Sequence, residues 1–80
     1  MAATKADIRS WLDEGRKKCA THVVVACDTF DWSDYPVFVM PGEDAKKKAS
    51  NLGEMQRLME VYNLALDLES QLGEHRAFNY

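Results

Sequence analysis

The sequence has few of the features that stabilise or target a short chain. Its 80 residues contain two cysteines, which are too few for the disulfide framework of many small extracellular domains. The segment "MAATKADIRSW" (residues 1–11) lacks the apolar core of a signal peptide. No apolar run approaches the roughly 20 residues that cross a bilayer. We therefore predict a cytoplasmic protein with free thiols that does not enter a membrane.

An excess of positive charge is also missing. The chain has 10 Lys and Arg against 13 Asp and Glu, which gives a net charge of −3, whereas nucleic-acid binders usually carry a basic face. Two basic triplets, residues 16–18 and 46–48, fall near the ends of predicted helices, where cations oppose the negative end of the helix dipole. We interpret both as solvated helix ends, and the sequence argues against nucleic acid as a partner.

Motifs of known enzymes are absent as well. The sequence has no glycine-rich phosphate loop, no Gly-x-Ser-x-Gly and no His-Glu-x-x-His. His22 and Cys27 are five residues apart on one predicted strand, which places them on opposite faces. Pairing of Cys27 with His75 stays open, although a cysteine among valines is typical of a buried apolar group. The sequence thus argues against an enzyme without deciding the question, and no cofactor is expected.

What the chain does contain is the pattern of one small α+β domain over residues 1–80, in the order α-β-β-α-β-α. Thr4 is a good N-cap, and an acid follows at Asp7, in the position that completes a capping box. Three consecutive valines favour a pleated backbone. Helices are predicted at residues 5–18, 43–50 and 68–76, and strands at 21–28, 35–40 and within 55–66. These strands predict a three-stranded, mainly antiparallel sheet with helices packed on it.

The segment 55–72 allows two interpretations. Helix propensity favours one long C-terminal helix over residues 54–73, which would leave a lone β-hairpin in the rest of the chain. An isolated hairpin is only marginally stable, so we favour a third strand followed by a short helix. As a strand, the segment would place Leu58 and Tyr62 on one face and Met59 and Val61 on the other.

The stretch "CDTFDWSDYPVFV" (residues 27–39) is the most unusual one. Three aspartates recur at every third position, namely Asp28, Asp31 and Asp34, with aromatic residues between and after them. Their spacing differs from that of a calcium loop, and aspartate commonly shapes turns. We therefore interpret the three as turn residues and expect no metal, while a divalent-metal site on these carboxylates is the alternative.

The aromatic residues of this hairpin offer a second kind of site. Trp32 could fold back over the core, or it could form an exposed anchor together with Phe30. Tryptophan and tyrosine dominate contact energies at protein interfaces, and acids around them form a polar rim. The interaction candidates are Phe30, Asp31, Trp32, Asp34 and Tyr35. The sequence predicts a small non-enzymatic protein-binding module whose partner is another protein or a second copy, as in a homodimer. A regulator that binds a small ligand or a divalent metal is the alternative function.

Two long segments resemble a family of short uncharacterised proteins of bacteria and their phages. They are "THVVVACDTFDWSDYPVFVMPGED" (residues 21–44) and "MQRLMEVYNLALDLESQLGEHRAF" (residues 55–78). The shared pattern runs Cys-Asp-Thr-Phe-Asp, Asp-Tyr-Pro-Val, Met-Gln-Arg, Met-Glu-Val-Tyr and Arg-Ala-Phe. The resemblance assigns no activity and no functional residue. It implies a small accessory protein of a phage or mobile element, of the kind that acts by binding a host protein.

Overall fold

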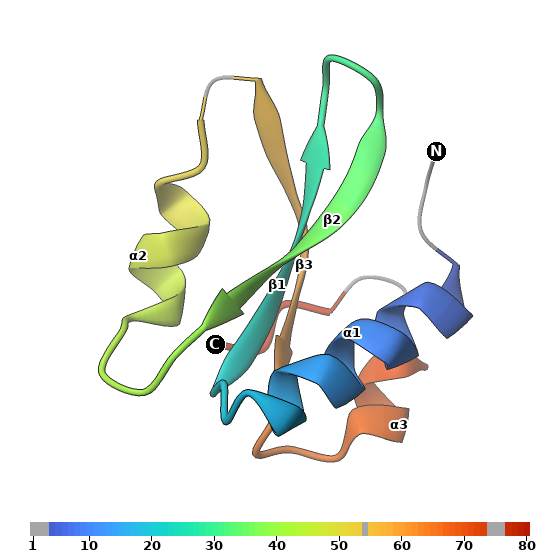
Figure 1. Cartoon of the computed structure of the whole chain (residues 1–80), viewed down its shortest axis with the longest axis vertical. Coiled ribbons are helices and arrows are strands. Elements are labelled where there is room, and N and C mark those ends of the chain that lie inside the picture. Colours follow the sequence, from blue (N-terminus) through green and yellow to red (C-terminus); the bar gives the residue numbers. More distant parts are fainter. Residues whose placement is uncertain (1–3, 54, 74–76) are drawn as a thin grey trace.

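The computed structural model describes residues 4–53, 55–73 and 77–80. Its elements follow the order α-β-β-α-β-α, which confirms the predicted fold class. The helices are α1 (Lys5–Lys17), α2 (Ala45–Ser50) and α3 (Leu68–Leu72), and the strands are β1 (His22–Asp28), β2 (Ser33–Val39) and β3 (Gln56–Asn63). The three strands form one antiparallel sheet in the order β2-β1-β3 (Figure 1). No helix within the described residues is long and apolar enough to cross a membrane.

Helix α1 begins and ends with local hydrogen bonds that the sequence encodes. The Thr4 hydroxyl accepts the amide of Asp7 at 3.2 Å, and the Asp7 carboxylate accepts the amide of Thr4 at 3.0 Å, which completes the predicted capping box. At the other end Cys19 adopts the left-handed conformation with φ 61°, and the Ala20 amide donates to the Gly15 carbonyl at 2.9 Å. This arrangement stops the helix in the way a glycine commonly does.

Strand β1 is the central strand of the sheet. Residues 23–27 are all buried, because β2 and β3 flank the strand and helices cover both of its faces. Strand β2 lies at an edge of the sheet and contains Pro36, a residue that cannot donate to a strand neighbour.

Strand β3 confirms the third strand, and the alternative of one helix over residues 54–73 is wrong. The expected assignment of its side chains to faces fails, however, because the strand contains a β-bulge. Val25 is opposite Glu60 and Ala26 is opposite Leu58, so the register of β3 against β1 shifts by one residue at Met59. The extra residue reverses the alternation. As a result Leu58 packs with Val61 on one face while Tyr62 packs on the other.

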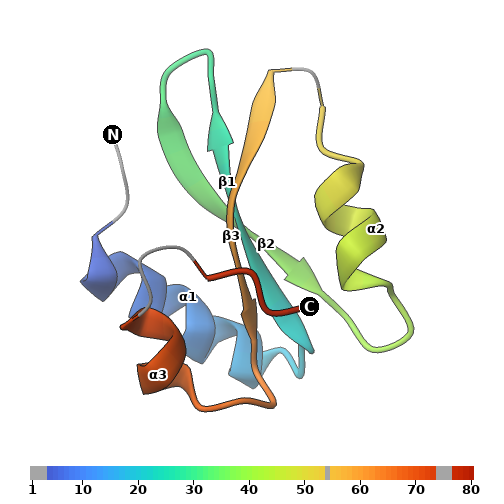
Figure 2. The same ribbon diagram turned by 180° about the vertical axis from the view of Figure 1, so that it is seen from behind.

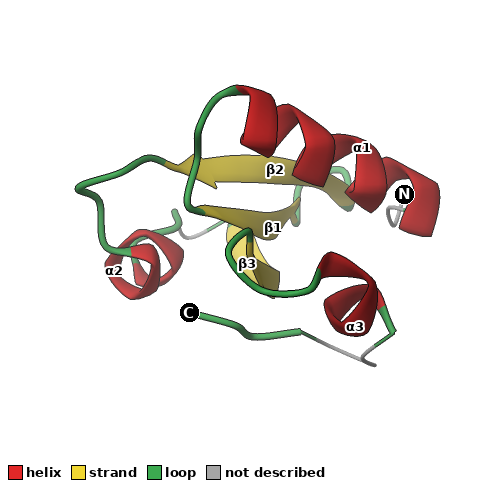
Figure 3. Cartoon of the chain, turned by 90° about the horizontal axis from the view of Figure 1, so that it is seen from below, coloured by secondary structure: helices red, strands yellow, loops and turns green. Residues whose placement is uncertain are grey.

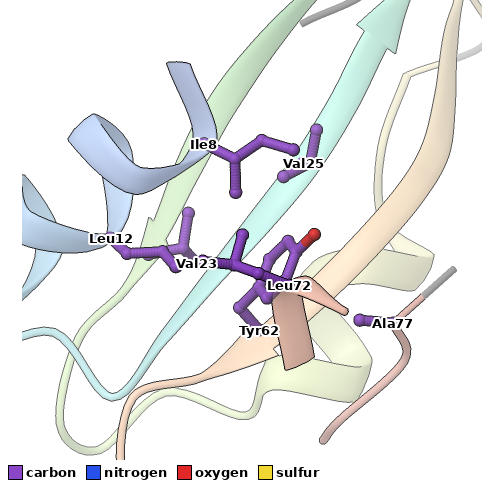
Figure 4. Close-up of a cluster of buried hydrophobic side chains, with 7 residues drawn as sticks. All are labelled: Ile8, Leu12, Val23, Val25, Tyr62, Leu72 and Ala77. Atoms are coloured by element: carbon purple, nitrogen blue, oxygen red, sulfur yellow. The ribbon is translucent and has the colours of Figure 1, made fainter. Parts of the chain in front are cut away.

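Each face of the sheet has its own apolar cluster. Helices α1 and α3 lie on one side of the sheet and α2 on the other (Figure 3). On the first side, side chains from both helices, β1, β3 and residue 77 converge around Tyr62 (Figure 4): Ile8, Leu12, Val23, Val25, Tyr62, Leu72 and Ala77. On the second side, two alanines of α2 let this helix approach the sheet closely. The buried residues of this cluster are Val24, Val39, Ala45, Ala49 and Val61.

The last helix is shorter than predicted and is tied to β3 by a buried glutamine. The expected helix over residues 68–76 begins at Leu68, with Asp67 as its N-cap, but it ends at Leu72; residues 74–76 lie outside the described part of the chain. The Gln71 side chain accepts the Asn63 amide at 2.7 Å and donates to the Asn63 carbonyl at 2.9 Å. A buried amide paired in this way fixes α3 against the end of β3.

Residues 77–80 run alongside the outer edge of β3 (Figure 2). The Val61 amide donates to the Ala77 carbonyl at 2.8 Å, and the Asn79 amide donates to the Val61 carbonyl at 3.0 Å, which makes a short parallel bridge. In this segment Phe78 is 44% exposed, whereas Ala77 is fully buried. The segment therefore docks through its backbone and one small side chain.

Candidate functional site

The β1–β2 connection is a tight four-residue loop, residues 29–32, shaped by two of the predicted aspartates. The Asp28 carboxylate accepts the amide of Phe30 at 2.9 Å, and the Asp31 carboxylate accepts the amide of Ser33 at 3.0 Å. The Trp32 amide donates to the Asp28 carbonyl at 2.7 Å and closes the loop. Both carboxylates thus bond the backbone two residues on, which is how aspartate forms turns.

The third aspartate has a different role. Asp34 lies within β2, opposite Cys27 in the register. Burial raises the pKa of the Cys27 thiol, and a hydrogen bond and negative charge from Asp34 raise it further. A thiol held protonated in this way is a poor nucleophile. The pairing of Cys27 with His75, which the sequence left open, is not tested, because His75 lies outside the described residues.

The metal alternative finds no support in the geometry of the hairpin. Asp28 and Asp31 direct an oxygen to backbone amides, and Asp34 lies beside Cys27. Over residues 4–53, 55–73 and 77–80, no three His, Cys, Asp or Glu side chains form a group that could hold a metal ion.

The aromatic residues of the loop are exposed. Phe30 is 82% exposed and Trp32 58% exposed, so Trp32 does not fold back over the core. Met55, just before β3, is 54% exposed, and its carbonyl accepts both the amide and the hydroxyl of Thr29 at 2.7 Å. Three large apolar side chains therefore stand on two hydrogen-bonded segments at one end of the sheet. We call Phe30, Trp32 and Met55 the hairpin patch; its loop projects beyond the three helices (Figure 1).

The backbone of Trp32 is strained. Its φ of 59° lies in the left-handed region, which costs an L-residue with a β-carbon about 1 to 2 kcal/mol and is usually occupied by glycine, asparagine or aspartate. A bulky aromatic residue is uncommon there, and such outliers concentrate at functional positions. The loop therefore holds an exposed tryptophan in a conformation that a smaller residue would adopt at lower cost.

The structure separates the predicted interaction candidates into two groups. Phe30, Asp31 and Trp32 share the exposed loop, whereas Asp34 and Tyr35 are half-buried in β2 and point to opposite faces of the sheet. Burial, followed by the negative charge of Asp28, raises the pKa of Tyr35. Met55 was not among the candidates, because only its hydrogen bonds to Thr29, 26 residues away in sequence, bring it to the hairpin.

The described surface also has hollows, and one of them is an open groove of about 570 Å³ beside α2. Val37 and Leu52 contribute apolar surface to it, and Lys48 pairs with Glu43 at 2.9 Å. This lysine lowers the pKa of Glu43 by a hydrogen bond. The groove is lined by Val37, Gly42, Glu43, Asp44, Lys47, Lys48, Asn51, Leu52 and Gln56. These lining residues include no histidine or cysteine and form no group that could hold a metal ion.

Comparison with known proteins adds no assignment. No model of a protein family matches the chain, and neither a curated protein nor a solved structure matches it. The resemblance to short bacterial and phage proteins therefore stays a prediction.

Proposed function

We propose that the protein is a small binding module that contacts another protein, or a second copy of itself, through the hairpin patch. The observation that carries this proposal is the exposure of Phe30 and Trp32 on one loop, with Trp32 in a strained left-handed conformation. Of the eight aromatic residues of the chain (10%), Phe30 and Trp32 are the two most exposed.

Physical chemistry favours a contact function for such a patch. Large apolar side chains on a protein surface gain free energy when a partner removes them from water. Aromatic side chains add a large contact area at a small cost in conformational entropy, and they form most interface hot spots. Contiguous exposed apolar surface commonly marks an interaction site. The loop is also well fixed by its own hydrogen bonds, so less ordering is needed when it binds.

The wider biological setting belongs to the proposal as well. A non-enzymatic accessory protein of a phage or mobile element would act by stoichiometric contact, and a small rigid domain with one exposed aromatic loop suits that mode. Self-association through the same loop would produce a homodimer with a two-fold interface.

Site-specific photo-crosslinking tests the proposal. A benzophenone-bearing phenylalanine analogue replaces Phe30 in one variant and the exposed Leu66 in a matched control. Leu66 follows β3 and therefore lies at the end of the sheet opposite the hairpin. We expect irradiation of cells that express the protein to give one discrete adduct from position 30, as a dimer or a heterologous complex, and none from position 66.

The same experiment can contradict the proposal. Equal diffuse labelling from both positions, or no adduct from position 30 at saturating expression, would show that the hairpin patch makes no specific contact. Trp32→Ala in the position-30 variant should remove the adduct, because loss of an interface hot spot costs about 2 kcal/mol or more. An adduct that survives this substitution would assign the contact to other residues.

A further inference from the structure

We infer that the surface that the hairpin patch accepts is basic, with an Arg or Lys side chain of the partner protein placed against the rings of Trp32 and Phe30. This inference rests on the proposed function and names the chemistry of the partner. It follows from the charges around the patch, from the aromatic faces within it and from the cost of covering both.

The charge at the hairpin end of the described chain is negative. Asp28, Asp31 and Asp34 lie in or next to the loop, against one base, Arg57, which is in register with Cys27. Four ion pairs join described residues elsewhere: two at the C-terminal end of α1, one between α1 and α3, and one between Glu43 and α2. None of these four includes Asp28 or Asp31. Each of these two carboxylates uses one oxygen for a backbone amide. A second oxygen on each side chain remains available to a partner.

The aromatic rings offer a second attraction for cations. A cation over an aromatic face is attracted by the ring quadrupole. The chain already makes this contact twice, with the Lys18 ammonium 4.4 Å from the centre of the Phe38 ring and the Lys46 ammonium 5.7 Å from that of Tyr80. At the hairpin the rings are exposed and carboxylates flank them, so a partner cation would gain from both at once.

Other kinds of partner fit less well. An apolar surface that covered Phe30 and Trp32 would also remove Asp28 and Asp31 from water without compensation, which is costly for a charged group. An acidic surface would add repulsion between like charges. A guanidinium or ammonium group is the chemistry that satisfies the carboxylates while the rings are buried.

Titration with short peptides tests the inference directly. The probe is the blocked pentapeptide Gly-Arg-Leu-Arg-Gly, and its control replaces both arginines with citrulline, which has nearly the same shape but no charge. The readout is the pair of indole N–H signals in a ¹H–¹⁵N spectrum of the whole chain, assigned with Trp11→Phe. We expect the arginine peptide to shift the Trp32 signal and not the Trp11 signal. The citrulline peptide should bind roughly fivefold more weakly, as the modest size of an exposed cation–π contact and ion pair implies.

Two variants with the same change of charge locate the effect. Asp31→Asn should weaken binding of the arginine peptide about threefold, since a surface ion pair contributes little more than this. Asparagine keeps the hydrogen bond to Ser33 and therefore the loop. Asp13→Asn, on the exposed face of α1, removes the same charge far from the loop and should leave the affinity unchanged.

The outcomes separate this inference from the proposed function. If both peptides shift the Trp32 signal with equal affinity, the patch binds but does not select a cation, and the inference is overturned while the proposed function stands. If neither peptide moves the Trp32 signal, the basic partner is likewise rejected, and photo-crosslinking from position 30 decides the proposed function alone. Equal losses of affinity for Asp31→Asn and Asp13→Asn would show that binding depends only on the net charge of the chain, and this result would also overturn the inference.

Discussion

The two ends of the sheet treat their large apolar side chains in opposite ways. At the end where β1 begins, α1 and α3 cover the strands, and Leu12 and Tyr62 are almost completely buried. At the hairpin end, no described helix reaches the loop (Figure 1). Phe30 and Trp32 on this loop are exposed. Hydrophobicity alone therefore does not decide burial in this protein. Residues of similar character are core or surface according to whether a helix covers their part of the sheet.

The largest loss of stability is expected for a substitution in the core at the helix-covered end of the sheet. Leu12→Ala removes a fully buried side chain and leaves a cavity, so the free energy of unfolding should fall by about 2 to 5 kcal/mol. A loss of this size could unfold a small domain. Urea denaturation followed by circular dichroism measures it, with the exposed neighbour Asp13→Ala as control. A loss below about 1 kcal/mol would mean that α1 contributes little to the core.

The two tryptophans permit a matched test of the comparison. Trp11 is half-buried and packs against the first cluster, so Trp11→Ala should cost about 2 kcal/mol, less than for a fully buried ring. Trp32→Ala should change stability by no more than about 0.5 kcal/mol, as for most surface substitutions. Equal losses in denaturation experiments would remove the distinction between the two ends.

Much of the fold could be predicted from the sequence, because many of its elements have local causes. The cap at Thr4, the valine run of β1 and Pro36 in an edge strand each follow from the chemistry of one short segment. What could not be predicted depends on distant contacts. The bulge at Met59 separates Leu58 from Tyr62, and the bridge between Val61 and residue 78 joins segments 17 residues apart.

The candidate site shows the same division. Asp28 and Asp31 could be recognised as turn residues, because each bonds the backbone two positions on. The same prediction is wrong for Asp34, which lies within β2. Whether Trp32 was core or surface stayed open, since exposure depends on where the helices end relative to the loop. Its left-handed backbone was not visible either, because tryptophan at such a position contradicts the usual preference for glycine.

Each end of the sheet also contains one strained residue, and the two should respond alike. Cys19 and Trp32 have φ values of 61° and 59°. Glycine adopts this conformation without strain, so Cys19→Gly should be about 1 kcal/mol more stable than Cys19→Ala, and Trp32→Gly more stable than Trp32→Ala by a similar amount. Each comparison removes the native side chain in both variants and so isolates the backbone. Alanine variants that equal the glycine variants in thermal denaturation would show that neither loop is strained.

A pH-dependent loss of stability should arise at the end where β1 begins. The Nε2 atom of His22 is buried without a hydrogen-bond partner among the described residues, and burial lowers the pKa of this histidine from its ordinary 6.5. The backbone of Tyr80 lies close enough to oppose this shift without reaching hydrogen-bond geometry. Below pH 6.5 the unfolded chain binds the proton before the folded chain does. The stability that comes from keeping His22 neutral is therefore fully present above pH 6.5, and it declines as the pH falls below this value.

Urea denaturation between pH 7.5 and 5.0 measures this decline. The unfolding free energy of the natural chain should fall more steeply over that interval than that of His22→Asn. The lowered pKa of Glu43 acts at more acidic pH, so it does not interfere. Parallel slopes for the two proteins would mean that His22 titrates alike in the folded and unfolded chains.

The smallest effect is expected for Asp31→Asn at the hairpin end. Asparagine keeps the hydrogen bond to the Ser33 amide and removes one of several like charges, so stability should change by less than about 0.5 kcal/mol. Calcium, magnesium and manganese should leave the melting temperature unchanged in either protein. Stoichiometric metal binding in calorimetry that Asp31→Asn abolishes would restore the metal alternative.

The short parallel bridge along β3 has a consequence for how the molecule behaves in a crowded solution. Residues 77–79 satisfy the outward amide and carbonyl of Val61, and Pro36 lies on the opposite edge strand. Both edges of the sheet are therefore poor templates for strand pairing between molecules. A chain that ended before residue 77 would expose the edge formed by β3. Such a chain should aggregate, as measured by light scattering at rising concentration, while most of its molecules are still folded.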